Sequence, residues 1–273
     1  MSYKVVAFDL DGTLINSRRE ITEQSMRAIE QIRQQGMKVV IVTGRHHVAV
    51  RAYHHQLGLD TPVVCCNGTY LYDFKNDCVI HGNPIGNDIA AQIVDFMDHD
   101  SINMLMYTTG AMNYQRVDDN IAGLQEWSRT LAPELRPVML QADLAQIVSS
   151  GETIWKFVAT GDDTDLIRSK VTEIETKLPL SCEWSWSNRV DLSAAGNTKG
   201  NQLAQLLNDW QIEPSELIAF GDNGNDMSMI QLAGVGVAMG NAVEPLKAAA
   251  DYVTDDHDNE GVAKGLAHFF DIA

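Results

Sequence analysis

The apolar residues at the start of the chain predict a strand, a helix and a second strand. Continuous apolar runs at residues 5–8 and 39–42, the second within a strand expected at 38–42, are typical of strands buried on both faces. Between them, apolar residues recur at helical spacing, with Thr22 as the expected N-cap and Gly36 as the stop. A right-handed crossover in such a unit makes the two strands parallel.

The last third of the chain repeats this alternation. Apolar runs at residues 217–220 and 236–239 predict buried strands, and a shorter run at 252–254 predicts another. Helical patterns precede and separate these runs, and a further strand is expected at residues 63–66. The alternation indicates an α/β fold with a doubly wound, Rossmann-like parallel sheet that has helices on both faces.

The middle of the chain follows a different pattern. The period-two stretch from Cys182 to Trp186 predicts a half-buried strand, and helical spacing from Ile167 to Leu178 marks an amphipathic helix. We therefore expect an α+β domain inserted into the sheet domain. The expected division assigns residues 1–82 and 188–273 to the sheet domain and residues 83–187 to the insertion.

Length and composition narrow the class of protein. The 273 residues suggest about two domains at ~150 residues each, and the 45% hydrophobic and 21% charged fractions are ordinary for a soluble globular protein. No apolar run approaches the ~20 residues of a membrane span, and the N-terminus lacks the apolar stretch of a signal peptide. The four cysteines form no CxxC pair, so we expect buried thiols in a reducing cytoplasm.

The charge of the chain limits its partners. A net charge of −17 at pH 7 repels nucleic-acid phosphates and anionic lipids, so we expect neither nucleic acid nor membrane as a partner. The same charge repels a small anionic substrate. Any phosphate site must therefore be made locally, by backbone N–H groups, a metal ion, or one or two well-placed cations.

The motif Asp9-Leu10-Asp11-Gly12-Thr13 directly follows the first predicted strand. Carboxylates two residues apart point the same way from an extended chain, and ligands of an open parallel sheet bind at the carboxyl ends of its strands. Like charges in such a place need a cation or a proton, so a hard divalent ion such as Mg²⁺ is the expected ligand. Taken alone, the motif also fits an ordinary Asp-Gly turn that ends a strand.

Three further motifs stand at comparable places. Thr43 and Gly44 follow the second strand, where a hydroxyl and N–H groups can hold phosphate oxygens. Lys199 begins a helix against the helix dipole, which favours a role toward a phosphate. The acidic, glycine-containing turn at residues 221–226 is typical of a metal-binding turn. Each alone also fits a turn, a cap or a solvated lysine, but together they indicate one site.

In this order, the four motifs resemble the haloacid-dehalogenase (HAD) superfamily of phosphatases. The insertion between Thr43 and Lys199 resembles the large α/β cap of the Cof-type subfamily. Segments similar to the bacterial pyridoxal-phosphate phosphatase branch are residues 43–47, 65–73, 155–157 and 182–186. The resemblance implies an Mg²⁺-dependent phosphomonoester hydrolase that acts on small phosphorylated metabolites, with pyridoxal 5′-phosphate as the expected substrate.

The resemblance also implies a role for each motif residue. Asp9 would be the nucleophile that forms an aspartyl-phosphate, and Asp11 the general acid and then the general base. Mg²⁺ would be held by Asp9, the backbone carbonyl of Asp11 and Asp222, with Asp226 in support. The residues expected to hold the transferring phosphoryl group are Leu10, Thr43, Gly44, Lys199 and Asn225.

Alternative functions stay open at this point. A sugar-phosphate phosphatase or phosphomutase of the same superfamily would use the same aspartyl-phosphate chemistry. A phosphate-sensing regulatory protein would also use a phosphorylatable aspartate, Mg²⁺, a threonine and a lysine, although Asp11 and the large insertion argue against it. A phosphate-release assay separates enzyme from sensor.

Some residues of the insertion are candidates only for a supporting role. Five aromatic residues could stack on a flat substrate head group, although most are expected to form the core of the inserted domain: Tyr107, Tyr114, Trp155, Trp184 and Trp186. His46 and His47 are expected to be solvated or packed rather than to be ligands.

Overall fold

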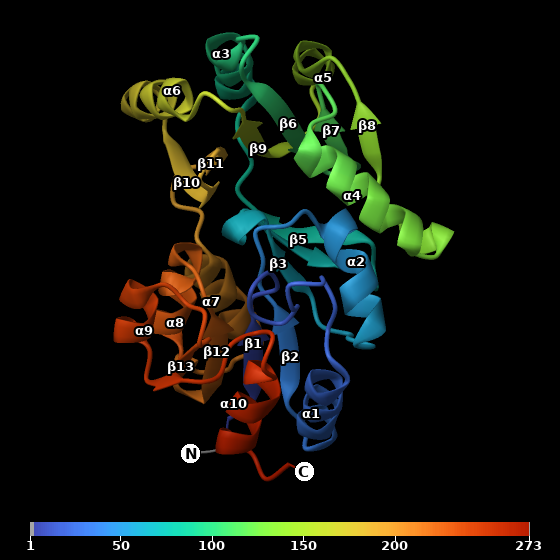
Figure 1. Cartoon of the computed structure of the whole chain (residues 1–273), viewed down its shortest axis with the longest axis vertical. Helices are drawn as coiled ribbons and strands as arrows, with labels where there is room; N and C mark the ends of the chain where they lie inside the picture. Colours follow the sequence, from blue (N-terminus) through green and yellow to red (C-terminus); the bar gives the residue numbers. More distant parts are fainter. Residues whose placement is uncertain (1–2, 273) are drawn as a thin grey trace. The chain divides into compact units, whose positions relative to one another are not determined.

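The computed structural model describes residues 3–272, which divide into two compact units (Figure 1). Unit 1 comprises residues 3–45, Tyr53–His81 and 198–272. Unit 2 comprises His46–Ala52 and Gly82–Asn197. The chain therefore leaves unit 1 and returns to it twice.

Within the described residues, unit 1 is built on a five-stranded parallel sheet. In spatial order its strands are β14 (Tyr252–Val253), β13 (Val235–Ala238), β12 (Leu217–Gly221), β1 (Val5–Phe8) and β2 (Lys38–Ile41). The residues of β1 and β12 are all buried, as continuous apolar runs predict. Because the strands are parallel, all of their carboxyl ends lie at one edge of the sheet.

Helices cover both faces of this sheet. Apolar side chains of α7 (Lys199–Asp209), α8 (Met227–Leu232) and α9 (Glu244–Ala249) share a core with Val5 and Ala7 of β1. On the other face, α1 (Glu23–Gln34) packs against α10 (Gly261–Phe269), and α10 lies on the ring of Phe220. The expected doubly wound α/β fold is confirmed. Within residues 3–272, no helix has the length and apolar character needed to cross a membrane.

The start of α1 shows how local sequence sets an element boundary. Thr22 is the N-cap, and its hydroxyl accepts a hydrogen bond from the N–H of Ser25 at 3.2 Å. The helix ends at Gln34, and Gly36 follows with a φ of 91°. Both boundary signals read from the sequence are therefore confirmed.

A small second sheet extends unit 1 beyond the parallel one. Its strands are β3 (Val63–Cys65), β4 (Tyr70–Asp73) and β5 (Cys78–Gly82), and β3 pairs antiparallel with β4. The turn that joins β3 to β4, Cys66–Gly68, contains the buried residue Asn67 at a φ of 57°. This turn matters because it lies at the candidate site.

Unit 2, all of whose residues are described, combines a mixed sheet with helices on one of its faces. In spatial order the strands are β10 (Leu180–Trp186), β11 (Arg189–Ala194), β9 (Ile154–Thr160), β6 (Asn103–Thr108), β7 (Met112–Tyr114) and β8 (Met139–Gln141). The helices that share its hydrophobic core are α3 (Asn87–Met97), α5 (Leu144–Ser150) and α6 (Thr164–Lys177). A further helix, α4 (Asp119–Thr130), follows β7.

The division into units differs from the expected one. The expected boundary after residue 187 falls between β10 and β11, which pair antiparallel from Leu180–Ala194 onward. A hairpin places both strands in one sheet, so unit 2 continues to Asn197. Residues 46–52 also belong to unit 2. The helix α2 (His47–Gln56) therefore begins in unit 2 and ends in unit 1.

The cysteines follow the expectation only in part. All four are free thiols; Cys65 and Cys66 are buried and Cys182 is half-buried. Cys78 is exposed, so the expectation of a buried thiol is wrong there. It begins the edge strand β5, whose residues alternate between exposed and half-buried positions.

Candidate active site

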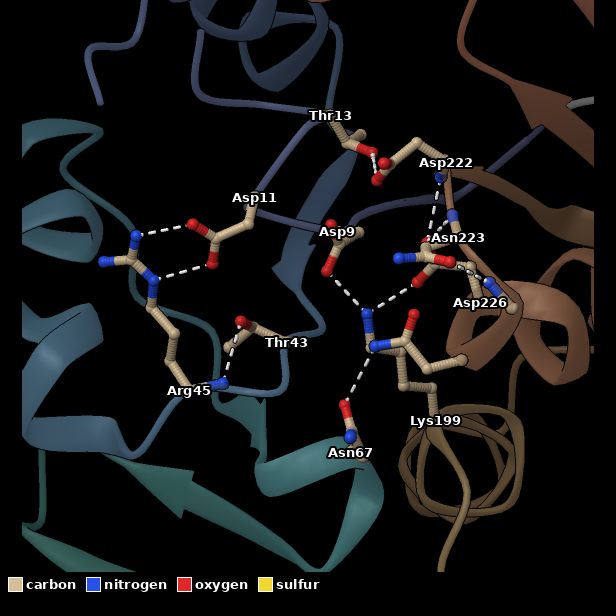
Figure 2. Close-up of polar contacts among 12 residues, drawn as sticks. Asp9, Asp11, Thr13, Thr43, Arg45, Asn67, Lys199, Asp222, Asn223 and Asp226 are labelled. Atoms are coloured by element: carbon tan, nitrogen blue, oxygen red, sulfur yellow. Dashed lines mark hydrogen bonds and ion pairs between the residues drawn. The ribbon is translucent and has the colours of Figure 1, made fainter. Parts of the chain in front are cut away.

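The loops after β1 and β12 and the start of α7 bring a cluster of charged side chains together (Figure 2). Lys199, fully buried, lies with its Nζ 2.5 Å from both Asp9 Oδ1 and Asp226 Oδ1. One carboxylate oxygen from each of Asp9, Asp222 and Asp226 lies within 4.8 Å of the other two. Motifs that are far apart in the sequence therefore meet at the carboxyl edge of the parallel sheet.

Gly12 allows the first loop to approach Asp222 closely. Its φ is +81°, and a Cβ built on it would lie only 2.5 Å from Asp222 Oδ2. The next residue, Thr13, donates its hydroxyl to Asp222 Oδ1 at 3.0 Å. The Gly12-Thr13 pair thus fixes Asp222 beside the first strand, which is a contact that the motif spacing alone does not predict.

Asp226 holds the turn that carries Asp222. Its Oδ2 accepts hydrogen bonds from the backbone N–H groups of Asp222 and Asn223, at 2.9 and 3.0 Å, while its Oδ1 accepts from Lys199. Both oxygens of this fully buried carboxylate therefore have protein partners. Asp226 thus fixes the turn, and its supporting role toward a metal stays a prediction.

The cluster contains more negative charge than one lysine balances. Burial and the nearby Asp226 raise the pKa of Asp222 to about 7, although Thr13 and Lys199 oppose the rise. Burial also raises the pKa of Asp9 against the opposing effect of Lys199. Burial alone would lower the pKa of Lys199, but Asp226 and Asp9 outweigh it and the pKa is raised. The ammonium therefore stays charged, and the carboxylates favour a further cation.

This set of oxygen atoms fits a hard divalent cation. Carboxylate oxygens are the ligands that Mg²⁺ prefers, and Asp9 and Asp222 each offer one within the 4.8 Å cluster. Because both oxygens of Asp226 are occupied by Lys199 and the backbone, Asp9 and Asp222 are the side chains suited to direct contact. A contribution from the Asp11 carbonyl stays a prediction.

The residues expected to hold a phosphoryl group line the same region. Thr43 is buried, and its Oγ1 accepts a hydrogen bond from the N–H of Arg45 at 3.1 Å. Asn225 Nδ2 donates to Asn67 Oδ1 at 3.1 Å, and a Cβ on Gly44 would lie 2.7 Å from that same oxygen. The side chain of Leu10 is fully buried, so any contact it makes with a phosphoryl group is through its backbone.

Asp11 does not share the contacts of Asp9, Asp222 and Asp226, because its partner is Arg45. Arg45 donates from Nε to Asp11 Oδ2 at 2.7 Å and from Nη2 to Asp11 Oδ1 at 2.6 Å. Figure 2 shows the two side chains facing each other, on the far side of Thr43 from Lys199. The expected acid–base residue is thus held by a cation that was not among the candidate site residues.

Arg45, Asn67 and Thr13 are site residues to which the motifs assign no role. Thr13 and Arg45 belong to motifs that were recognised, but nothing in their spacing indicates which side chain each contacts. For Asn67, the available signal was a polar Asn-Gly pair directly after a buried strand. Such a pair at the carboxyl end of a strand is a reasonable candidate for a site residue.

His46 and His47 lie in unit 2 and are both buried. His46 Nε2 lies 2.7 Å from the carbonyl oxygen of Thr108, and the two imidazole rings are 4.3 Å apart. Burial lowers the pKa of His46 to about 3 and that of His47 to about 2. They are packed residues, which is one of the two environments expected for them.

Fold and site together define a hydrolase class. Residues 6–266 match the family of haloacid dehalogenase-like hydrolases, and the chain belongs to this family. The resemblance drawn from the four motifs is confirmed, and so is the expectation of a phosphatase of this family.

Individual relatives cover nearly the whole chain. The chain is 39% identical over 267 residues to the pyridoxal phosphate phosphatase YbhA of Escherichia coli (strain K12), with 97% of each protein covered. It is 26% identical over 272 residues to the 5-amino-6-(5-phospho-D-ribitylamino)uracil phosphatase YitU of Bacillus subtilis (strain 168), with 98% of each covered. A haloacid dehalogenase-like hydrolase from Bacteroides thetaiotaomicron superposes with a TM-score of 0.83 at 26% identity, over 98% of this chain and 100% of that one.

Proposed function

We propose that this protein is an Mg²⁺-dependent phosphomonoesterase that works through an aspartyl-phosphate on Asp9. The observation that carries the proposal is the buried Asp9 carboxylate, held by Lys199 and placed beside Asp222. Bound between Asp9 and Asp222, Mg²⁺ would offset the repulsion between a carboxylate nucleophile and a phosphate dianion. The family match favours this enzyme over the phosphate-sensing alternative.

Asp9 and Asp11 divide the chemistry between them. An oxygen of Asp9 attacks phosphorus, the bond from phosphorus to the ester oxygen breaks, and Asp11 gives its proton to the departing alkoxide. Water then attacks the phosphorus of the aspartyl-phosphate, and Asp11 takes the proton of that water. The bond to Asp9 breaks, which releases inorganic phosphate and restores the carboxylate.

The remaining site residues stabilise the transferring phosphoryl group. Lys199 offers a positive charge that is already fixed between two carboxylates, so little reorganisation is needed when a phosphoryl group arrives. We assign the other contacts to the Thr43 hydroxyl, the backbone N–H groups of Leu10 and Gly44, and the Asn225 amide. Asn67 orients Asn225 through the hydrogen bond between their side chains.

We propose pyridoxal 5′-phosphate as the substrate, because the relative with 39% identity over 97% of both proteins is named a pyridoxal phosphate phosphatase. Other small phosphorylated metabolites remain alternatives, since YitU is named for a different phosphate ester.

Of the candidate aromatic residues, Trp186 alone is an exposed large side chain, at 72%; the rings of Tyr107, Tyr114 and Trp155 are buried within unit 2. Stacking of one of these rings on a flat head group stays a prediction.

The test is a phosphate-release screen over a panel of phosphomonoesters that includes pyridoxal 5′-phosphate and simple sugar phosphates. We expect activity that chelation removes and Mg²⁺ restores, and a kcat/KM for pyridoxal 5′-phosphate above that of the sugar phosphates. Asp9→Asn should remove turnover and leave the fold intact. Mg²⁺-dependent turnover by Asp9→Asn would contradict the mechanism, whereas equal kcat/KM values across the panel would contradict only the substrate. The cytoplasmic location stays a prediction from composition.

A further inference from the structure

Asp11 is an exposed carboxylate with a fixed orientation. Its side chain is 55% exposed, while that of Arg45 is only 16% exposed. The guanidinium contacts both carboxylate oxygens through two separate N–H groups, at 2.7 and 2.6 Å. This two-pronged geometry fixes the plane of the carboxylate as well as its position.

Arg45 is itself held by its surroundings. Its guanidinium lies over the ring of Tyr53, 5.3 Å from the centroid, and Tyr53 is buried. Its backbone N–H donates to the Thr43 hydroxyl at 3.1 Å, and its carbonyl accepts from the N–H of Cys66 at 3.0 Å. A mobile surface pair would contribute little to orientation, but here two hydrogen bonds fix the backbone of Arg45 and the Tyr53 ring packs against its guanidinium.

We propose that Arg45 is a positioning residue that sets the orientation of Asp11 for proton transfer. The proposal rests on the assignment of Asp11 as general acid and base in the proposed function. Proton transfer requires the donor to lie within hydrogen-bond reach of the leaving oxygen, and an exposed aspartate samples several rotamers. Arg45 restricts Asp11 to one of them. It acts through Asp11 and has no direct part in the chemistry.

A comparison of phosphate esters with different leaving groups distinguishes a positioning role of Arg45 from a general loss of structure. An alkyl ester needs a proton on its departing alkoxide, whereas p-nitrophenolate leaves without one. Because kcat/KM reports the steps up to the first irreversible one, it reports departure of the leaving group. We therefore compare an alkyl phosphate that the wild type hydrolyses with p-nitrophenyl phosphate.

In Arg45→Gln we expect kcat/KM for the alkyl phosphate to fall about 100-fold and that for p-nitrophenyl phosphate to fall less than about 10-fold. Arg45→Lys keeps the charge but not the two-pronged contact, so an alkyl-specific defect of about 10-fold should remain. The matched control is Arg33→Gln. Arg33 donates to the carbonyls of Leu57 and Gly58 at 3.0 and 2.8 Å in the same unit, and its loss should leave the ratio of the two kcat/KM values unchanged.

Several results would overturn the proposal. Equal losses with both esters would indicate that Arg45 contacts the phosphoryl group or supports the fold. Full activity in Arg45→Lys would show that charge rather than orientation matters. A wild type that hydrolyses neither ester overturns the proposed function, and the role of Arg45 with it, whereas an active wild type with an unchanged ratio in Arg45→Gln overturns only the role of Arg45.

Discussion

Lys199 is the residue on which the charge balance of the site depends. Its ammonium is fully buried and lies between the carboxylates of Asp9 and Asp226. A lysine at a helix start opposes the helix dipole, and the structure shows what offsets that cost: two anionic partners within hydrogen-bond distance. The same lysine thus stabilises the folded chain and presents a positive charge next to the proposed nucleophile.

Lys199→Met should strongly destabilise the protein, because it leaves two buried carboxylates without their cation. Removal of one partner from a buried pair typically costs about 3–5 kcal/mol. The matched control is Lys4→Met, since Lys4 pairs with Glu216 at 2.7 Å but is 52% exposed; there we expect about 0–1 kcal/mol. Urea denaturation at pH 7.5 without metal measures both values. Similar losses in the two variants would contradict the central role of Lys199.

For single residues, the sequence predicts which charged side chains belong to the site better than it predicts which side chains they contact. Asp9, Lys199 and Asp222 are predictable because each follows a strand or begins a helix, which is a local signal. For Arg45 and Asn67 the role lies in the partner, Asp11 for Arg45 and Asn225 for Asn67, and no local signal indicates these partners. A contact made by loop approach depends on tertiary packing, and no spacing rule encodes it.

Among the elements, α7 and the turn Cys66–Gly68 pack unusually closely. Gly68 has a φ of +89°, and a Cβ built on it would lie 2.0 Å from the carbonyl oxygen of Thr198 and 2.9 Å from the backbone nitrogen of Lys199. Thr198 is the N-cap of α7, and its hydroxyl accepts from the N–H of Asn201 at 3.0 Å. The turn after β3 therefore helps to place the first residue of α7, which is Lys199.

Gly68→Ala should push the start of α7 away and lower both stability and turnover. A left-handed backbone costs a non-glycine residue about 1–2 kcal/mol, and the overlap with Thr198 adds about 1–3 kcal/mol. Gly36→Ala is the control, because Gly36 has a φ of +91° and a Cβ built on it would have no atom within 4 Å. It should show the first cost alone and normal turnover. Equal stability losses would mean that the turn moves without strain.

The elements themselves were largely predictable from hydrophobic pattern. β1, β2 and β12 were found from continuous apolar runs, and α1 from its spacing and cap. The boundary between the units is less predictable, because the expected boundary at residue 187 separates β10 from β11 and their antiparallel pairing depends on tertiary structure. The place of residues 46–52 in unit 2 has no local signal either, because the helix α2 is continuous and only its packing divides it between the units.

For the molecule as a whole, the net charge of −17 means that any phosphate site must be made locally, by backbone N–H groups, a metal ion, or one or two well-placed cations. Lys199 and Arg45 are such cations among the described site residues, and each is already paired with a carboxylate. The site therefore contains positive side chains, although the net charge of the chain is negative. Long-range repulsion of an anionic substrate weakens as salt is added.

The buried histidines make the stability of the whole molecule depend on pH. Burial lowers the pKa of His46 to about 3, against about 6.5 in an unfolded chain. Above pH 6.5 neither state holds the proton, so the stability contribution is fully present. Below pH 6.5 the unfolded chain binds a proton that the folded one does not. The free energy of unfolding should then fall by about 1.4 kcal/mol per pH unit for this residue, down to about pH 3.

Asp222 acts in the opposite direction. Its folded pKa of about 7 lies above the unfolded value, so the folded protein binds the extra proton and gains stability as pH falls from about 7 to 4. The two effects partly cancel in the wild type, and a single pH curve does not separate them. A comparison of variants does, because each substitution removes one group and leaves the other.

His46→Gln keeps a donor for the Thr108 carbonyl and removes the titrating ring, so its free energy of unfolding should fall less steeply with acid than that of the wild type. Urea denaturation between pH 6 and 4, without metal, should show a slope difference that approaches about 1.4 kcal/mol per pH unit. His55→Gln is the control, because it makes the same substitution at an exposed histidine. Parallel curves for wild type and His46→Gln would mean that His46 takes up its proton in the folded protein as readily as in the unfolded chain.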